Sequence, residues 1–225
     1  MYKVVFIRHG ESIWNKKDIF TGWTDIGLSR KGKKEAKKAK KLLKDYSFDM
    51  AFCSVLKRAI QTLDIILKKK NTPFYKSRAL NERHYGALQG KSKSEIREKY
   101  GQEKFFQWRR SYKIKPPSLE KGEVRTESLE DTFLRVIPYW KNIIRPEVKK
   151  GERVLVVSHG SVMRALLKYF NNISDKDIEN VNVPTGFPLI FEFDNSMMPI
   201  KHYYLGDEEE VAKATSGVRD QGEVL

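Results

Sequence analysis

Short apolar runs alternate along this chain with longer amphipathic segments, and this alternation limits the folds that the chain can adopt. Tyr2–Ile7, Met50–Cys53 and Phe74–Ser77 are predicted as strands, and the segments between them, Ser29–Lys44 and Val55–Lys69, have helical spacing. Strands that alternate with helices are typical of a mostly parallel central sheet with helices on both faces. We therefore expect an α/β fold.

The pattern is interrupted once and then resumes. Residues 81–126 are polar and rich in aromatic side chains, with helices predicted over Lys93–Tyr100 and Glu103–Arg110, so we expect a helical cap insertion there. Gly206–Leu225 has few apolar residues, and we expect a mobile C-terminal tail. The elements predicted between the cap and the tail are a helix interrupted near Pro138 (Leu129–Ile144), a strand (Val154–Ser158), a helix (Val162–Phe170) and two strands (Leu189–Phe193 and His202–Leu205).

The composition is that of a globular protein in a reducing compartment. Apolar residues make up 40% of the 225 residues, enough for one buried core, so we expect a single domain over residues 1–225. Cys53 is the only cysteine, and no Cys/His cluster has zinc spacing, so we expect neither a disulfide nor a structural metal. The apolar runs are too short for a signal peptide or a membrane span. We expect a cytoplasmic protein with no membrane partner.

The positive charge of the chain points to an anionic partner. Lysine and arginine outnumber aspartate and glutamate by 44 to 29, a net charge of +15, and Arg30–Lys44 alone has nine basic residues against Glu35. Such an excess favours phosphates, nucleic acids or acidic surfaces. No aromatic residues lie among these lysines, so we interpret Arg30–Lys44 as a solvated helix face and expect no nucleic-acid partner.

Two predicted strands are each followed closely by a His-Gly pair. Tyr2–Ile7 is followed by Arg8-His9-Gly10-Glu11, and Val154–Val157 by Ser158-His159-Gly160-Ser161. Ligands of open α/β sheets bind outside the carboxyl ends of the strands, and a glycine there lets the backbone approach a ligand closely. A single histidine at a strand end is more often a hydrogen-bonded structural residue, but two at equivalent positions favour a shared site.

A pair of histidines in a basic protein suits phosphoryl transfer. A neutral imidazole is a nucleophile toward phosphorus, and the resulting phosphohistidine is labile enough to pass its group on. The second imidazole, if protonated, and Arg8 could neutralise the oxygens of the transferring group. We therefore propose a phosphoryl site from His9, His159 and Arg8.

Two further residues complete this candidate site. Arg58 opens the helix that follows Met50–Cys53 and would face the same edge of the sheet, although it could equally be a surface arginine. Glu82 follows another strand, and a carboxylate among phosphate-binding cations suits acid–base work on a substrate hydroxyl. The alternative for Glu82 is a structural acid paired with an arginine.

Together, these residues stand in motifs that resemble the cofactor-dependent phosphoglycerate mutases of the histidine phosphatase superfamily. The resemblance runs in order from Met1 to about Asp207. RHGE marks the superfamily, whereas LNERHYGALQG and WRR mark the mutase branch. The matching segments are RHGESIWN (8–15), FTGWTD (20–25), SVLKRA (54–59), LNERHYGALQGKSKSE (80–95), QWRR (107–110), ESLEDT (127–132), RVIPYW (135–140), VVSHGSVMRAL (156–166), PTGFPLIFEFD (184–194) and YYLGD (203–207).

The resemblance implies a role for each matching residue. His9 is the phosphorylated nucleophile, Glu82 the proton donor and acceptor, and His159 with Arg8 and Arg58 the electrostatic cradle. The implied reaction interconverts 3-phosphoglycerate and 2-phosphoglycerate, primed by 2,3-bisphosphoglycerate and without a metal. The residues implied to bind phosphate are Ser12, Asn15, Thr21, Gly22, Gly160 and Ser161, and those implied to hold the glycerate, its carboxylate and the distal phosphate are Arg83, Tyr85, Lys93, Arg109 and Arg110.

The chain departs from the family pattern at two places. Ser161 stands where the family usually has asparagine, although a backbone amide contact there can survive. The segment between Pro117 and Glu127 is short, whereas many members insert a longer loop that helps to cover the site. The short segment keeps a phosphatase, in which water hydrolyses phospho-His9, as the alternative function. It also leaves the assembly open between a monomer, a homodimer and a tetramer in a commonly oligomeric family.

Overall fold

A six-stranded sheet lies at the centre of the structure. The computed structural model describes residues 1–68, 71–118 and 126–221. The strands are β1 (Tyr2–Arg8), β2 (Met50–Cys53), β3 (Phe74–Lys76), β4 (Val154–Ser158), β5 (Pro188–Phe193) and β6 (Pro199–Tyr204), in the order β3-β2-β4-β1-β5-β6. β1 to β4 are parallel to one another, whereas β5 pairs antiparallel with both β1 and β6. This confirms the prediction of a mostly parallel sheet.

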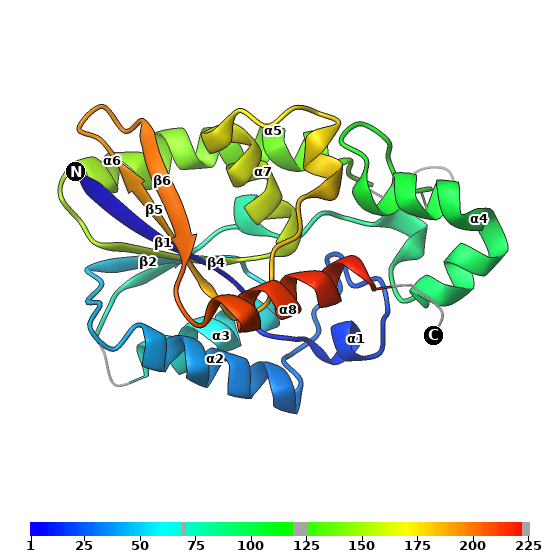
Figure 1. The fold of residues 1–225 in the computed structure, drawn as a ribbon, viewed down its shortest axis with the longest axis horizontal. Helices are drawn as coiled ribbons and strands as arrows, with labels where there is room; N and C mark the ends of the chain where they lie inside the picture. Colours follow the sequence, from blue (N-terminus) through cyan, green and yellow to red (C-terminus); the bar gives the residue numbers. More distant parts are fainter. Residues whose placement is uncertain (69–70, 119–125, 222–225) are drawn as a thin grey trace.

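Helices cover both faces of the sheet, as Figure 1 shows. On one face lie α5 (Leu129–Tyr139) and α7 (Gly160–Asn171), and on the other lie α2 (Arg30–Leu42) and α3 (Lys57–Leu67). The remaining elements are α1 (Ile13–Lys16), α4 (Lys93–Arg110), α6 (Arg145–Lys149), α8 (Glu208–Arg219), the 3₁₀ turns η1 (Arg78–Leu80), η2 (Gly86–Leu88) and η4 (Asp177–Asn180), and the π-helical η3 (Trp140–Ile144). Within the described ranges, none of the helices is long and apolar enough to cross a membrane.

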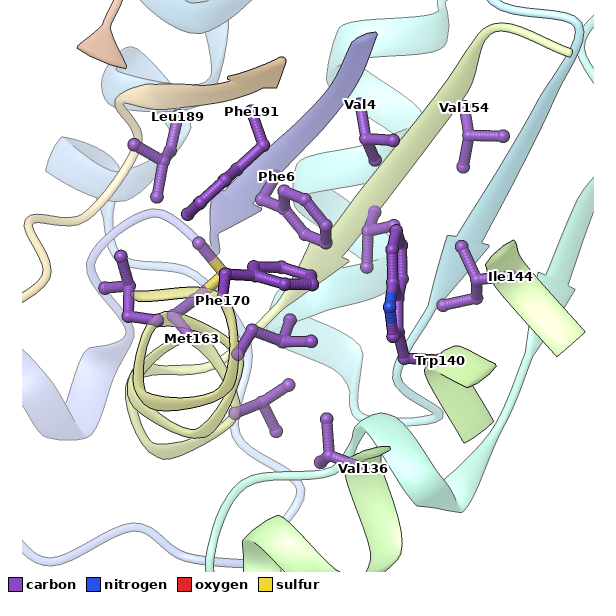
Figure 2. Close-up of a cluster of buried hydrophobic side chains, with 14 of the residues drawn as sticks. Val4, Phe6, Val136, Trp140, Ile144, Val154, Met163, Phe170, Leu189 and Phe191 are labelled. Atoms are coloured by element: carbon purple, nitrogen blue, oxygen red, sulfur yellow. The ribbon is translucent and has the colours of Figure 1, made fainter. Parts of the chain in front are cut away.

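The core is divided between the two faces by the alternation of the strands. Successive side chains of a strand point to opposite faces, and in β1 Val4 and Phe6 join the cluster under α5 and α7. Figure 2 shows Phe6 in that cluster beside Trp140 and Phe170. The intervening residues of β1 pack against α2 and α3 instead. β1 is therefore buried on both sides, which anchors the residues that follow it.

The two helices predicted within residues 81–126 appear in the structure as α4. α4 stands beyond the end of the sheet, away from the N-terminus (Figure 1). It bends at Gly101, which has φ 83° and separates the two helices that the sequence predicted. Residues 119–125 of the predicted cap lie outside the described residues.

The helix expected to be interrupted near Pro138 continues past that residue in a changed form. Pro138 lies inside α5, and a π-helical turn over Trp140–Ile144 follows before α6 resumes the α-helix. Proline has no N–H to donate to the preceding turn, so the hydrogen-bond ladder is disturbed there. The interruption is therefore a local change of helix type.

The prediction of a mobile tail over the C-terminal segment is wrong for its described part. Residues 208–219 form α8 rather than the mobile tail that we expected from 206 onward. The Asp207 side chain caps the helix, and three glutamates follow in its first turn, where the helix dipole favours negative charge. No residue of α8 is fully buried, so its apolar content gave little warning of a helix. Residues 222–225 lie outside the described residues.

Candidate active site

The two strand-end histidines meet because β1 and β4 are neighbours in the sheet. Their last paired residues are Arg8 and Ser158, and the amide of His9 donates to the Ser158 carbonyl over 2.9 Å. The rings of His9 and His159 lie with centroids 4.9 Å apart and planes at 64°. Both side chains are buried. The sheet therefore holds the pair that the sequence placed at equivalent positions.

The His9 ring is held in one tautomer. Its Nδ1 lies 2.7 Å from the Gly10 carbonyl, which can only accept, so Nδ1 carries the hydrogen and Nε2 keeps its lone pair. Burial, and then the charges of Arg58 and Arg8, hold the pKa of His9 well below its ordinary value. At neutral pH the ring is thus an uncharged imidazole with Nε2 as its nucleophilic atom.

The loop after His9 is shaped by a close approach to α2. A Cβ built on Gly10 would lie 2.3 Å from the Gly32 carbonyl oxygen, and one built on Gly32 would lie 2.0 Å from the Glu11 carbonyl oxygen. The Gly10 amide donates to Thr62 Oγ1 over 3.1 Å. Two glycines on different segments are therefore needed to seat the loop against α2 and α3.

Arg58 lies in the first turn of α3 and is buried against His9. Its Nε donates to His9 Nε2 over 3.3 Å, and its two Nη atoms donate to the carbonyls of Thr24 (3.0 Å) and Gly22 (2.7 Å). Burial lowers its pKa to about 10, so the guanidinium stays charged at neutral pH. Arg58 thus ties the 22–24 loop to the nucleophile.

Arg8 supplies a second buried cation near the histidines. Its Nη1 donates to the Val183 carbonyl over 2.6 Å, whereas its Nε has no hydrogen-bond partner in the described structure. A Cβ added at Gly160 would lie 3.4 Å from the guanidinium carbon, so the first residue of α7 packs closely on this group. One buried donor of Arg8 is therefore left for a ligand.

Glu82 is buried beside these cations. Its Oε1 accepts from the amides of Arg83 (2.9 Å) and Ser161 (3.0 Å). Burial by itself would raise the pKa of Glu82, but the Arg83 amide, the charges of Arg58 and Arg8, and the bond to Ser161 together lower it below the ordinary value. Glu82 is thus a carboxylate able to take a proton, and the amide of Ser161 holds it despite the changed side chain.

These groups line one cavity at the carboxyl ends of β1 and β4. Among the described residues that line it, Glu82 carries the only carboxylate, whereas six are arginines or lysines. The predicted residues on its wall are Arg8, His9, Asn15, Thr21, Gly22, Arg58, Glu82, Tyr85, Lys93, Arg109, Arg110, Gly160 and Ser161. Within the described residues no three His, Cys, Asp or Glu side chains gather into a metal site. The wall suits an anion with several negative charges.

Three predicted residues do not line the cavity. Ser12 caps α1 by accepting from the Asn15 amide, and His159 is not itself a lining residue but lies with its ring against that of His9, which does line the cavity. Arg83 is fully buried, donates through Nη2 to the carbonyls of Trp108 and Arg109, and lies over the Tyr85 ring. Arg83 therefore supports the cap through Nη2 and packs on Tyr85, whereas its Nε and Nη1 are buried without a hydrogen-bond partner in the described structure.

The cap brings its cations to the cavity from α4. Lys93 Nζ donates to Asp18 Oδ1 (2.8 Å) and to Gln221 Oε1 (3.0 Å). Burial lowers the pKa of Lys93 to about 8, although Asp18 opposes the shift. Arg110 donates to the carbonyls of Glu179 and Val181, which fixes it against η4.

Sequence reasoning missed several residues of the wall. Arg164 on α7 donates through Nη2 to the carbonyls of Arg110 and Ile178. It stands four residues after Gly160 and so on the same helix face, a spacing that could have identified it. The end of α8 also reaches the wall, where Arg109 donates to the carbonyls of Val218 and Arg219. The other unpredicted wall residues are Ile19, Phe20, Val183, Val218 and Gln221.

Comparisons with known proteins agree with this geometry. Residues 4–205 match the histidine phosphatase superfamily (branch 1). Two 2,3-bisphosphoglycerate-dependent phosphoglycerate mutases, from Borreliella burgdorferi strains ZS7 and B31, are each 49% identical to this chain over 247 aligned residues that cover 100% of both chains. The alignment is longer than the 225 residues of this chain, so it contains gaps in this chain.

Solved structures show the same fold. Bacillus stearothermophilus YhfR is 25% identical with a TM-score of 0.76, over 88% of this chain and 94% of its own. A putative alpha-ribazole-5'-P phosphatase from Escherichia coli K-12 is 21% identical with a TM-score of 0.76, over 92% and 96% of the two chains. At that identity the second likeness concerns the fold alone.

Proposed function

The chain belongs to the histidine phosphatase superfamily and, within it, to the 2,3-bisphosphoglycerate-dependent phosphoglycerate mutases, and we propose that it interconverts 3-phosphoglycerate and 2-phosphoglycerate through a phosphoryl group on His9 Nε2. The observation that supports this most directly is the state of His9: a buried, neutral imidazole with Nδ1 bound to the Gly10 carbonyl, in a cavity walled by arginines and lysines. Such a ring is a nucleophile in surroundings that stabilise a phosphoryl anion.

The transfer balances with Glu82 as the proton carrier. The free hydroxyl oxygen of a bound monophosphoglycerate attacks the phosphorus on His9, the P–N bond breaks, and the hydroxyl proton passes to the Glu82 carboxylate. The product is 2,3-bisphosphoglycerate and free His9. In the reverse step, with the other phosphate placed against Nε2, that phosphoryl group returns to His9 and Glu82 gives its proton to the oxygen left behind.

The cations of the wall then have two tasks. Arg8 and Arg58 lie next to the histidines, where they would neutralise the group in transfer, and phosphoryl transfer depends mainly on such positioning and charge. Lys93, Arg109 and Arg110 come from the cap and would bind the second phosphate and the carboxylate. This division accounts for a ligand that is anionic at both ends.

Several finer statements belong to the same proposal. We propose that 2,3-bisphosphoglycerate primes the enzyme by phosphorylating His9, that the reaction needs no metal ion, and that residues 1–225 form one domain in which the cap covers the site. The partners are then phosphorylated small molecules, without nucleic acid or membrane. We place the enzyme in the cytoplasm, where the single buried Cys53 stays reduced, and a homodimer is one assembly to test by sedimentation.

A product assay with one variant tests the reaction and separates it from the phosphatase alternative. The His9→Ala variant should lose isomerisation, because no nucleophile remains to carry the phosphoryl group. His202, on the edge strand β6 and outside the cavity, offers a matched control, and His202→Ala should keep parental turnover. Isomerisation that survives His9→Ala would contradict the proposal, and release of inorganic phosphate without isomer formation in the parent enzyme would identify a phosphatase.

A further inference from the structure

A chain of buried hydrogen bonds leads away from Nε2 of His159, whose ring packs against that of His9. His159 Nε2 lies 2.8 Å from Ser54 Oγ, and Ser54 Oγ lies 2.9 Å from Asn81 Oδ1. All three side chains are buried. The other ring nitrogen, His159 Nδ1, is buried without a hydrogen-bond partner in the described structure.

The hydrogen positions in this chain follow from one backbone amide. Val55 N–H donates to Asn81 Oδ1 over 3.3 Å, and since an amide can only donate, the oxygen of Asn81 must face this way. Ser54 Oγ contacts the same oxygen, so its single hydrogen is directed at Asn81. Ser54 Oγ also accepts from the Leu56 amide over 3.1 Å. With its hydrogen committed, Ser54 can only accept from His159.

It follows that His159 carries a hydrogen on Nε2. A second hydrogen, on Nδ1, would be a buried donor without an acceptor on a charged ring, which is costly. Burial, and then the nearby charge of Arg58, also hold the pKa of His159 well below its ordinary value. In the ligand-free site, His159 is thus neutral and Nδ1 presents a lone pair.

We propose that Ser54 and Asn81 are positioning residues of the reaction: they fix the tautomer and the ring plane of His159 so that Nδ1 is the atom that meets the phosphoryl group on His9. The proposal rests on the proposed function for its last step only. When a phosphoryl anion lies against Nδ1, a proton taken up there gives a donor to its oxygens, while Nε2–H stays bound to Ser54. We call the hydrogen bonds from Ser54 and Asn81 to His159 the tautomer lock. This lock lets His159 gain and lose the proton on Nδ1 without a rotation of its ring.

The tautomer can be read directly in the ligand-free enzyme. Nitrogen NMR of ring-labelled histidine distinguishes a protonated from an unprotonated ring nitrogen, and it needs no substrate. We expect His159 to show hydrogen on Nε2 and none on Nδ1. A parent enzyme with the hydrogen on Nδ1 would overturn the proposal, whatever its activity.

Substitutions at Asn81 test whether the tautomer lock determines which nitrogen of His159 carries the hydrogen. Asn81→Asp keeps an acceptor for Ser54 and Val55, so the tautomer of His159 should be unchanged. Asn81→Leu has a similar volume but no acceptor, which frees the Ser54 hydrogen to face the ring, so a population with hydrogen on Nδ1 should appear. An Asn81→Leu variant that is folded and has the parental ring spectrum would refute the assignment.

Turnover separates positioning from simple structural support. Ser54→Ala should lower kcat about 10- to 100-fold, the loss typical when a partner that orients a functional imidazole is removed from a metal site, with a smaller change in KM. Ser158→Ala is the matched control, because Ser158 Oγ is equally buried and donates to the Leu80 carbonyl over 2.7 Å beside His159 without touching its ring. Equal losses in kcat for the two variants would mean that Ser54 is only structural.

The NMR spectra and the kinetic measurements test the tautomer lock and the proposed function independently. If the parent enzyme shows the expected tautomer but no isomerisation, the proposed function is contradicted and the tautomer lock is still supported. If the parent isomerises and Ser54→Ala keeps kcat within a factor of two of Ser158→Ala, the function remains and the positioning role is lost.

Discussion

The change Arg58→Lys keeps a positive charge beside His9 but removes the shape that holds three acceptors at once. Arg58 donates from separate nitrogens to His9 Nε2, the Thr24 carbonyl and the Gly22 carbonyl. A lysine has one nitrogen at the end of a flexible stem. It can reach one of these acceptors in good geometry, and the others lose their donor inside a buried site.

The size of the effect follows from those lost bonds. A buried acceptor left without its donor destabilises a protein by about 1–3 kcal/mol, so two of them would lower the free energy of unfolding by about 2–6 kcal/mol. Small globular proteins have about 5–15 kcal/mol in total, so the variant should fold but be measurably weakened. Turnover should also fall, because the 22–24 loop and His9 lose their common anchor.

Urea unfolding and steady-state kinetics on the same preparation check this prediction. Lys57→Arg is the control, since Lys57 is exposed and its ion pair with Asp25 can be kept by an arginine. The control should match the parent in both measurements. The reasoning would be refuted by an Arg58→Lys enzyme with parental unfolding free energy and with turnover within a factor of two of the parent.

Three further predictions concern other groups of the site. Glu82→Gln keeps Oε1 as an acceptor for Arg83 and Ser161 but removes the base, so kcat should fall roughly 10²- to 10⁴-fold with little change in melting temperature; unchanged turnover would exclude the acid–base role. The KM for 3-phosphoglycerate should rise as the pH increases through about 8, because Lys93 is charged below its lowered pKa and neutral above it, and Lys93→Gln should abolish that step in a KM–pH profile. Gly32→Ala should lower both the melting temperature and turnover, because the alanine Cβ would lie 2.0 Å from the Glu11 carbonyl oxygen. This clash should outweigh the preference of alanine for helix, which is about 1 kcal/mol, and a raised melting temperature would contradict the prediction.

Most elements could be predicted because their signals are local. The apolar run of β2 and the Ser29 cap of α2 appear in the structure where the sequence placed them. The meeting of His9 and His159 was predictable too, since the carboxyl ends of parallel strands share one edge of a sheet. What remained open was that β1 and β4 are adjacent, which depends on residues about 150 positions apart.

Two places where the structure adds to or departs from the expectations involve polar contacts between distant segments. α8 has no fully buried residue, and its end is held by Arg109, 110 residues earlier. Arg83, which the resemblance implies at the substrate, does not line the cavity and donates through Nη2 to α4 carbonyls. Neither outcome leaves a periodic pattern in the sequence, because a guanidinium can donate to any carbonyl that the fold brings near.

The sequence by itself determined the sheet class, the family motifs and the identity of the groups that can do the chemistry, because strand and helix periodicity and residue type are local properties. Only the tertiary structure decided which nitrogen of each histidine is free: His9 by the Gly10 carbonyl, and His159 by Ser54 and Asn81. The physical reason is that a neutral imidazole has one hydrogen and two possible sites for it. The choice between them is made by neighbours that the fold brings together.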